Sequence, residues 1–289
     1  GENNTNTVLS YFGMGDTTDR IIEMGGTTGG VTLDQSGTNA LIYTGGMIVS
    51  GVGSKTLTLQ GSTIGTGEFT GVISNGPGSA IALMKAGSGT WTLSNANTYT
   101  NGTQIKDGGT LVAAHPNALG TGIVLFPNSL QGTLDLANDG VGETTNEINM
   151  QSGAVGTIRS NRSTPGEGIN HNLGMWRLSG VTAIVTNGAN VVSGKSSITA
   201  AYLDLYAGGV ATTTLFPTTA DLFIEGGVSI ISLTGNFAKT LQLDGPGQGS
   251  VIRGPISNGL NTVSLTKANT GTWTLTGSNT YSGATAVNN

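Results

Sequence analysis

The chain has 289 residues, of which 49 are glycine, and only 9% are charged, whereas ordinary soluble domains carry about 25%. A net charge of −5 with 11 basic residues argues against a nucleic-acid-binding protein, because binding to phosphates needs clustered Lys and Arg. No apolar run approaches the roughly 20 residues of a membrane-spanning helix. The chain has no cysteine, so it has neither disulfides nor thiolate metal sites.

Short alternating runs predict strands rather than helices along the whole chain. Hydrophobic residues make up 36% of the sequence, enough for a buried core. In the run 90–94, Trp91 and Leu93 share one face and hydroxyl side chains the other, which is typical of a half-buried strand. Further strands are expected at 104–106, 110–112, 122–125, 132–136, 182–185, 198–205, 221–224, 228–233 and 241–243.

Self-comparison shows a long internal duplication. The segment 85–99 returns at 267–281, and two upstream blocks, 71–76 and 55–59, return at 254–259 and 239–243. Three blocks in the same order at nearly constant offset predict that 55–107 and 239–289 are two copies of one unit. Position 289 aligns with Asp107, just before a Gly-Gly-Thr-Leu strand. We therefore expect the natural chain to continue with a similar strand.

The recurrence of apolar positions predicts the architecture. Leu93, Leu111 and Leu134 are about 20 residues apart, a spacing found in stacked repeats. The predicted fold is all-β, with residues 1–289 forming one continuous parallel β-helix whose rungs pair through their backbones. At roughly 22 residues a rung, the chain would make on the order of 13 rungs. Tandem β-sandwiches are the alternative.

The duplicated segments resemble a known repeat. Residues 85–111 contain Gly-Thr-Trp-Thr-Leu, Asn-Thr-Tyr-Thr-Asn-Gly-Thr and Gly-Gly-Thr-Leu. They resemble the autotransporter-associated β-strand repeat (passenger-associated transport repeat), and 267–289 resembles it as far as it runs. The resemblance implies a right-handed β-helical passenger or stalk of a large secreted bacterial surface protein. In that family the repeat is expected to aid passage through, or folding outside, the outer membrane.

Residues that carry catalytic chemistry do not converge in the sequence. His115 lies in an expected turn and His171 in an expected polar loop, and neither has a second histidine at metal-ligand spacing. The motifs of serine hydrolases, phosphate-binding loops and zinc proteases are absent. We therefore predict no catalytic, cofactor-binding or metal-binding residues, and no cofactor.

Acidic clusters offer the remaining route to an enzyme or a metal site, since glycoside hydrolysis needs two flanking carboxylates. The best candidate is the segment 135–147, as a weak Ca²⁺ site or an acid/base pair, with a solvated loop as the alternative. The clusters are Asp135, Asp139, Glu143 and Glu147; Asp16, Asp19 and Glu23; and Asp204 with Asp221.

Aromatic residues recur as pairs, Trp91 with Tyr99 and Trp273 with Tyr281. They form either a platform on which sugars stack or part of the packed inside of each rung. Repetition at the same rung position favours packing. Trp176 occurs once and fits either role.

Taken together, these features predict a non-enzymatic structural or adhesive segment, a stalk or fibre, of a repetitive extracellular protein at the bacterial surface. The expected partners are adjacent repeats of a longer chain or other copies, pairing end to end through open strand edges, and surface glycans. We expect neither nucleic-acid binding nor a membrane-spanning segment. The alternatives are a polysaccharide-degrading β-helix enzyme, with a stripe of carboxylates on one outer sheet, and a carbohydrate-binding module that uses Trp176.

Overall fold

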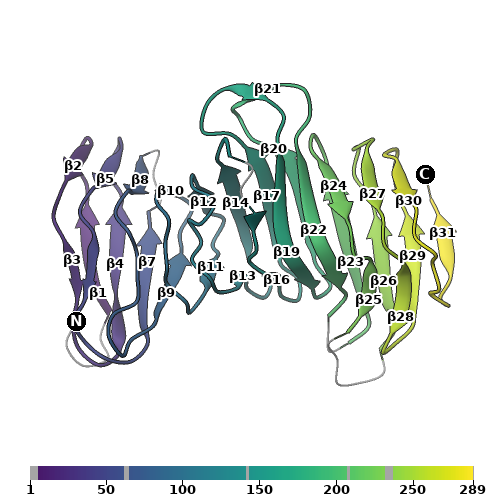
Figure 1. The fold of residues 1–289 in the computed structure, drawn as a ribbon, viewed down its shortest axis with the longest axis horizontal. Coiled ribbons are helices and arrows are strands. Elements are labelled where there is room, and N and C mark those ends of the chain that lie inside the picture. The colour runs from purple at the N-terminus through teal and green to yellow at the C-terminus, as the bar shows by residue number, and fades with distance from the viewer. Residues whose placement is uncertain (1–5, 62–64, 141–142, 207–208, 232–236, 289) are drawn as a thin grey trace. The chain divides into compact units, whose positions relative to one another are not determined.

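The computed structural model describes residues 6–61, 65–140, 143–206, 209–231 and 237–288. These residues form 31 strands and no helix, and therefore no helix that is long and apolar enough to cross a membrane. The chain divides into two compact units (Figure 1): unit 1 is 1–125 with 131–138, and unit 2 is 126–130 with 139–289. The strands stack in parallel as a β-solenoid. The predicted parallel β-helix is confirmed, and the antiparallel ladders of β-sandwiches are not what the described strands form.

Unit 1 is built from two parallel sheets and one short extra pair, β3 (Ile22–Met24) with β6 (Met47–Val49). Each turn of the chain adds one strand to each sheet. The first sheet has the order β1 (Asn6–Tyr11), β4 (Gly29–Gln35), β7 (Lys55–Gln60), β9 (Ile81–Lys85), β11 (Thr103–Ile105) and β13 (Val124–Phe126), and the second β2 (Asp16–Thr18), β5 (Leu41–Tyr43), β8 (Thr66–Phe69), β10 (Thr90–Leu93), β12 (Thr110–Ala113) and β14 (Gln131–Ala137).

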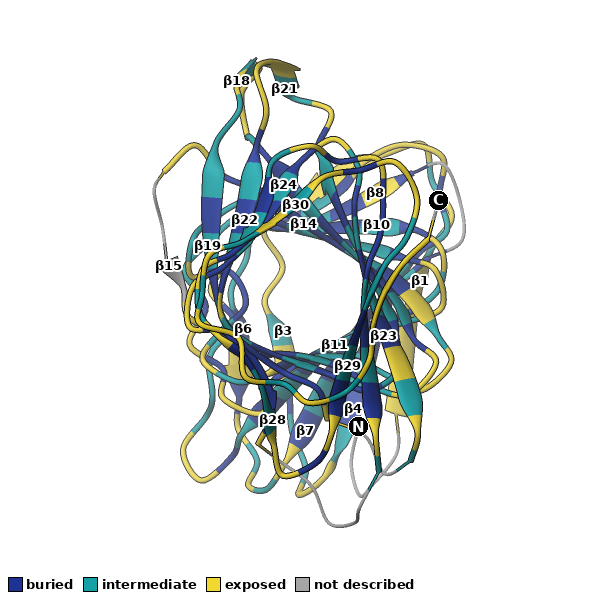
Figure 2. Ribbon diagram, turned by 90° about the vertical axis from the view of Figure 1, so that its right-hand side faces the viewer, coloured by how far each residue is buried: buried dark blue, intermediate teal, exposed yellow. Residues whose placement is uncertain are grey.

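Unit 2 follows the same plan with longer strands. A small parallel pair, β18 (Gly166–Glu167) with β21 (Val191–Ser193), forms an arm at the edge of its stack (Figures 1 and 2). One sheet contains β15 (Glu143–Thr144), β16 (Ile148–Met150), β19 (Asn170–Leu178), β22 (Ser197–Asp204), β24 (Asp221–Ile224), β25 (Val228–Ile230), β27 (Ser250–Ile252), β28 (Ile256–Gly259) and β30 (Trp273–Leu275), and the other β17 (Val155–Asn161), β20 (Thr182–Asn187), β23 (Ala211–Pro217), β26 (Lys239–Leu243), β29 (Val263–Lys267) and β31 (Thr285–Val287).

The length of a turn varies more than the sequence predicted. Register partners are 20 residues apart where Thr90 faces Thr110, but 32 apart where Ala183 faces Leu215. The second sheet has six strands in unit 1 and six in unit 2, one for each turn, which is close to the order of 13 rungs expected. Backbone pairing constrains the strands but leaves the connecting loops free to lengthen at small entropic cost.

Alternation along each strand builds the core, since every second side chain faces inward. Figure 2 shows buried and half-buried residues alternating along the strands. In the second sheet of unit 1, the register places Tyr43, Phe69 and Leu93 in one inward column, and all three are buried. Apolar side chains thus stack on apolar side chains from turn to turn, and this packing excludes water from the narrow core.

The largest residue of this core depends on a glycine in the preceding turn. Trp91 is fully buried, and its register partner in β8 is Gly67. A Cβ atom at Gly67 would lie 2.4 Å from the Trp91 indole ring. Tyr43 stacks on the same indole with a centroid separation of 6.3 Å. The pairing of glycine with tryptophan therefore gives the bulky ring its room.

Candidate functional site

The two histidines have different surroundings and different hydrogen-bond partners. His115 is half-exposed in the turn after β12, where its Nδ1 accepts a hydrogen bond from the Asn117 backbone N–H at 3.0 Å. The expectation of a polar loop at His171 is wrong: the residue lies in β19, only 1% exposed, with Nδ1 2.8 Å from Ser160 Oγ. Its asparagine neighbours suggested a loop, but they occupy the outward positions of a strand.

The described carboxylates of the segment 139–147 pair with separate arginines, Arg162 and Arg177. Asp139 accepts hydrogen bonds from Ser163 and Thr164 and pairs with Arg162 at 3.1 Å. The two hydroxyl groups, with a smaller contribution from Arg162, hold the pKa of Asp139 below its usual value. Among the described residues, no group of three or more His, Asp or Glu is placed to hold a metal ion.

The remaining unit 2 carboxylates of the candidate clusters are also engaged by cations. Arg177 bridges Glu147 at 3.0 Å and the fully buried Asp204 at 3.2 Å. Asp221 pairs with Lys195 at 2.5 Å. The Glu143 side chain lies outside the described residues. These ion pairs link side chains of neighbouring turns. That the chain has no catalytic or metal-binding residue stays a prediction.

The aromatic pairs of the repeats pack as predicted in the first copy. Trp91 and Tyr99 are both fully buried, whereas Trp273 and Tyr281 are half-buried. Trp176 is also fully buried, in β19. A sugar cannot stack on a side chain without exposed surface, so the use of Trp176 in a carbohydrate-binding module is wrong.

A lysine in each copy of the repeat binds the carbonyl groups of a turn. Lys85 continues the inward column of Leu59 and is 0% exposed, and its Nζ donates to the carbonyl oxygens of Ala86 at 2.7 Å and Gly87 at 2.9 Å. Burial lowers the pKa of Lys85 to about 8, although Asp107 opposes the shift. In the second copy, Lys267 Nζ donates to Ala268 at 2.5 Å and Asn269 at 2.7 Å.

An asparagine of the repeat joins three successive turns. Asn97 Oδ1 accepts from the Ile73 backbone N–H at 2.8 Å, and its Nδ2 donates to the Ala118 carbonyl at 2.7 Å. Both bonds are buried. The equivalent Asn279 accepts from the Ile256 backbone N–H at 2.9 Å. These side chains form hydrogen bonds with backbone groups that lie outside the strand ladders. Buried backbone N–H and carbonyl groups need such partners, because an unpaired one destabilises the fold.

Further contacts recur between the two copies with nearly the same geometry. Tyr99 Oη lies 2.6 Å from Thr103 Oγ1, and Tyr281 Oη lies 2.7 Å from Thr285 Oγ1. The indole N–H of Trp91 donates to the Gln60 carbonyl at 2.8 Å. That of Trp273 donates to the Asp244 carbonyl at 3.1 Å. The register matches too, with Leu59 facing Lys85 and Leu243 facing Lys267.

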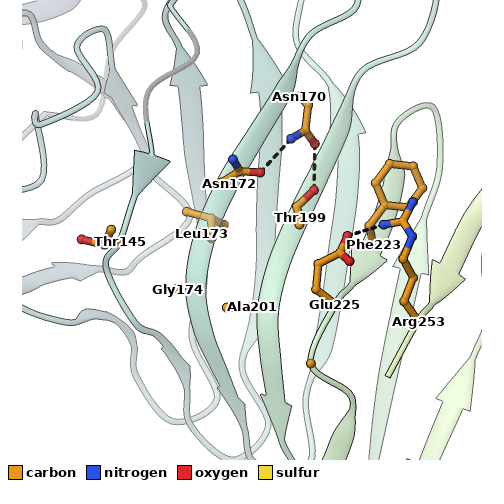
Figure 3. Close-up of a pocket in the computed structure, with 11 residues that line it drawn as sticks. Thr145, Asn170, Asn172, Leu173, Gly174, Thr199, Ala201, Phe223, Glu225 and Arg253 are labelled. Atoms are coloured by element: carbon orange, nitrogen blue, oxygen red, sulfur yellow. Dashed lines mark hydrogen bonds and ion pairs between the residues drawn. The ribbon is translucent and has the colours of Figure 1, made fainter. Parts of the chain in front are cut away.

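Unit 2 also carries a groove of about 850 Å³ on its outer surface (Figure 3). Small residues, Gly174, Ala201 and Gly226, line it alongside polar and aromatic side chains. Asn170 Nδ2 donates to Asn172 Oδ1 at 2.7 Å, and Thr199 Oγ1 donates to Asn170 Oδ1 at 2.9 Å. The lining also includes Thr145, Leu173, Phe223, Glu225 and Arg253.

Comparison with known proteins identifies the repeated segments. The family model described as passenger-associated-transport-repeat matches residues 83–113 and 265–289. These two segments are passenger-associated-transport repeats. The matches contain all the recurring Lys, Trp, Asn and Tyr side chains described above, and the resemblance predicted from the sequence is confirmed.

A curated relative points to the same class of protein. The chain is 34% identical over 131 residues to the protein named adhesin BmaC autotransporter from Brucella suis biovar 1 (strain 1330). The aligned part is 45% of this chain but only 3% of that protein. No solved structure gives a significant match.

The asparagine that joins three turns predicts a measurable asymmetry between the two repeats. Replacing it in Asn97→Ala leaves a buried N–H and a buried carbonyl unpaired, and should lower the free energy of unfolding by about 1–3 kcal/mol. Asn279→Ala should cost less, because Asn279 is exposed and water can replace its amide. Chemical denaturation of both variants measures the difference. Equal losses would contradict a bridging role for Asn97.

The buried Lys85 predicts how stability depends on pH. An unfolded lysine titrates near pH 10.4, so between about pH 8 and 10.4 the unfolded chain binds more protons than the folded chain, and stability rises with pH. Burial raises the pKa of Tyr99, so stability should fall again above about pH 10.

The variant Lys85→Met isolates this contribution, because Tyr99 and the other titrating groups are the same in both proteins. From pH 7 to pH 10, the free energy of unfolding of the unaltered chain should rise by up to about 3 kcal/mol relative to the variant. Urea unfolding at several pH values measures it. Parallel pH profiles would show that Lys85 is not held in a desolvated site.

Proposed function

We propose that this chain is a non-enzymatic structural and adhesive segment, a stalk or fibre, of a large bacterial protein displayed at the cell surface. The observation that carries the proposal is the pair of passenger-associated-transport repeats, whose signature Trp and Asn side chains bind the backbone of neighbouring turns. Similarity to a protein named as an autotransporter adhesin supports the same role. The aligned part spans about 3% of that relative's length.

A stack of turns joined by parallel ladders is suited to a mechanical role as a stalk or fibre. Parallel ladders link each turn to its neighbours, so a turn can open only by breaking hydrogen bonds on both sides. Few charges reduce repulsion between stacked turns, and the absence of cysteine makes the fold independent of oxidation. We propose that residues 1–289 wind as one continuous solenoid and that 239–289 repeats the unit 55–107.

A catalytic role has less support. A polysaccharide-degrading enzyme needs two carboxylates held around a scissile bond, one of them available as an acid. The carboxylates of Asp139, Glu147, Asp204, Asp221 and Glu225 each pair with an arginine or a lysine. Hydrogen bonds from Ser163 and Thr164 hold the pKa of Asp139 below its usual value, which opposes its use as a general acid.

The proposed partners are neighbouring turns, from adjacent repeats of a longer chain or from other copies. Among the described strands, β1 pairs with β4, and β31 with β29, each along one edge. Open edges of parallel strands accept further strands. Val8 and Leu9 of β1 are 55% and 51% exposed, which is the apolar surface that such pairing would cover.

Antibodies against the 289-residue chain test the surface role. They should label intact bacteria that produce the natural protein, and a strain lacking its gene is the control. Protease added outside the cells should remove the label. Labelling that appears only after the cells are made permeable would contradict a surface location.

A further inference from the structure

We infer that the groove of unit 2 binds an extended, uncharged stretch of oligosaccharide. This inference deepens the adhesive part of the proposed function, because it names the site and the chemical class of its ligand. The groove lies on the outer face of β19, β22 and β24, and its lining residues fall outside both matched repeat segments. The repeat motif therefore does not dictate which residues line the groove, and these residues can serve to bind a ligand.

Small residues give the groove its depth. Ala201 lies exposed in β22, and Gly174 and Gly226 flank it on the neighbouring turns. A Cβ atom at Gly174 would lie 2.5 Å from the Thr145 carbonyl oxygen, and one at Gly226 would lie 2.5 Å from that of Ala201. The close backbone approach leaves no side chain over the floor, so a flat ring can enter from solvent.

One wall presents a row of amides and hydroxyls. Asn172 and Thr199 are register partners on adjacent strands, so their side chains follow one another at the strand spacing of about 4.8 Å. Asn170 accepts from Thr199 and donates to Asn172, which orients the Asn172 amide. Figure 3 shows the Asn172 amide nitrogen directed away from Asn170. Ordered amides and hydroxyls offer both donors and acceptors, as sugar hydroxyls require.

The other wall combines an aromatic ring with two planar charged groups. The Arg253 guanidinium lies 4.7 Å from the centroid of the Phe223 ring and pairs with the Glu225 carboxylate. Glu225 and Arg253 remain about 45% exposed, and their charges cancel. Planar groups of this kind bind two adjacent hydroxyls at once, and the half-buried phenyl ring suits the apolar face of a sugar.

Other ligands fit the groove less well. A peptide strand needs an open sheet edge, but β19, β22 and β24 are paired on both sides. An anionic polymer needs unbalanced positive charge, whereas Arg253 is neutralised by Glu225 and the chain carries −5 overall. A neutral sugar chain needs neither, and an open groove admits the middle of a long chain.

A glycan array that carries neutral and uronic-acid-containing oligosaccharides, probed with the 289-residue chain, tests the inference. The chain should bind neutral oligosaccharides. Ala201→Trp fills the groove from an exposed position and should weaken binding at least about tenfold. Arg253→Ala, also at an exposed position, should weaken it by a similar factor. Thr212→Trp adds the same side chain to an exposed site on β23 and should bind as the unaltered chain does.

Each other outcome overturns the inference. No binding to any neutral oligosaccharide, or equal binding by Ala201→Trp and the unaltered chain, would exclude the groove as a glycan site. Binding confined to the uronic-acid sugars, or capture of extended peptides on a parallel peptide array, would assign it another ligand. These results leave the labelling of intact cells unaffected, so failure of this site and failure of the surface role are distinguishable.

Discussion

The structure depends on backbone hydrogen bonds between successive turns of the chain, because a parallel β-solenoid has no other element to hold it together. Within each sheet the ladders pair the backbones of neighbouring strands, but the turns leave N–H and carbonyl groups outside the ladders. Buried groups of this kind destabilise a fold unless side chains bind them. The signature of the repeat is the set of residues that do so. Lys85 binds turn carbonyls, Asn97 links an amide to a carbonyl, and Trp91 donates from its indole.

This view explains why the repeat has polar residues at positions that are fully buried. A lysine inside an apolar column costs desolvation free energy, which its lowered pKa reflects. Its long side chain reaches carbonyls that a shorter residue would leave unpaired. The same arrangement at Lys267, with the same register, shows that sequence and contacts repeat together. The sequence of a stacked turn is therefore constrained in two ways. Its apolar residues must pack the core, and its polar residues must form hydrogen bonds with the buried backbone groups of the turns.

The sequence predicted the fold class well because two periodicities were strong. Alternation along 90–94 identified the inward face of Trp91 and Leu93, and the duplication identified the repeat. It failed where polar residues occupy strands. His171, between two asparagines, looked like a loop, yet its inward position in β19 buries it. The lengths of individual turns, 20 residues in one place and 32 in another, could not be predicted because loop length leaves no periodic signal.

The groove of unit 2 could not be found from the sequence, since its lining comes from five separate segments between Thr145 and Arg253. No spacing rule links such residues before the register of the strands is known. One signal was present: Phe223 alternates with two buried neighbours, Leu222 and Ile224, which places a phenyl ring on the outer face. An outward aromatic on a strand of otherwise small and polar outward residues is the feature to look for in related chains. The repeats build the scaffold, and segments between them are free to carry binding surfaces.

The most direct test of the stacked parallel register is disulfide formation between engineered cysteines, which the natural sequence makes unambiguous because it contains none. Thr92 and Val112 face each other outside β10 and β12. Cysteines at these two positions should be about 4.8 Å apart at Cα and should cross-link under mild oxidation. Thr92→Cys combined with Ala114→Cys, shifted two residues along the strand, should remain reduced. Cross-linking of the shifted pair, with none for the register pair, would contradict the account.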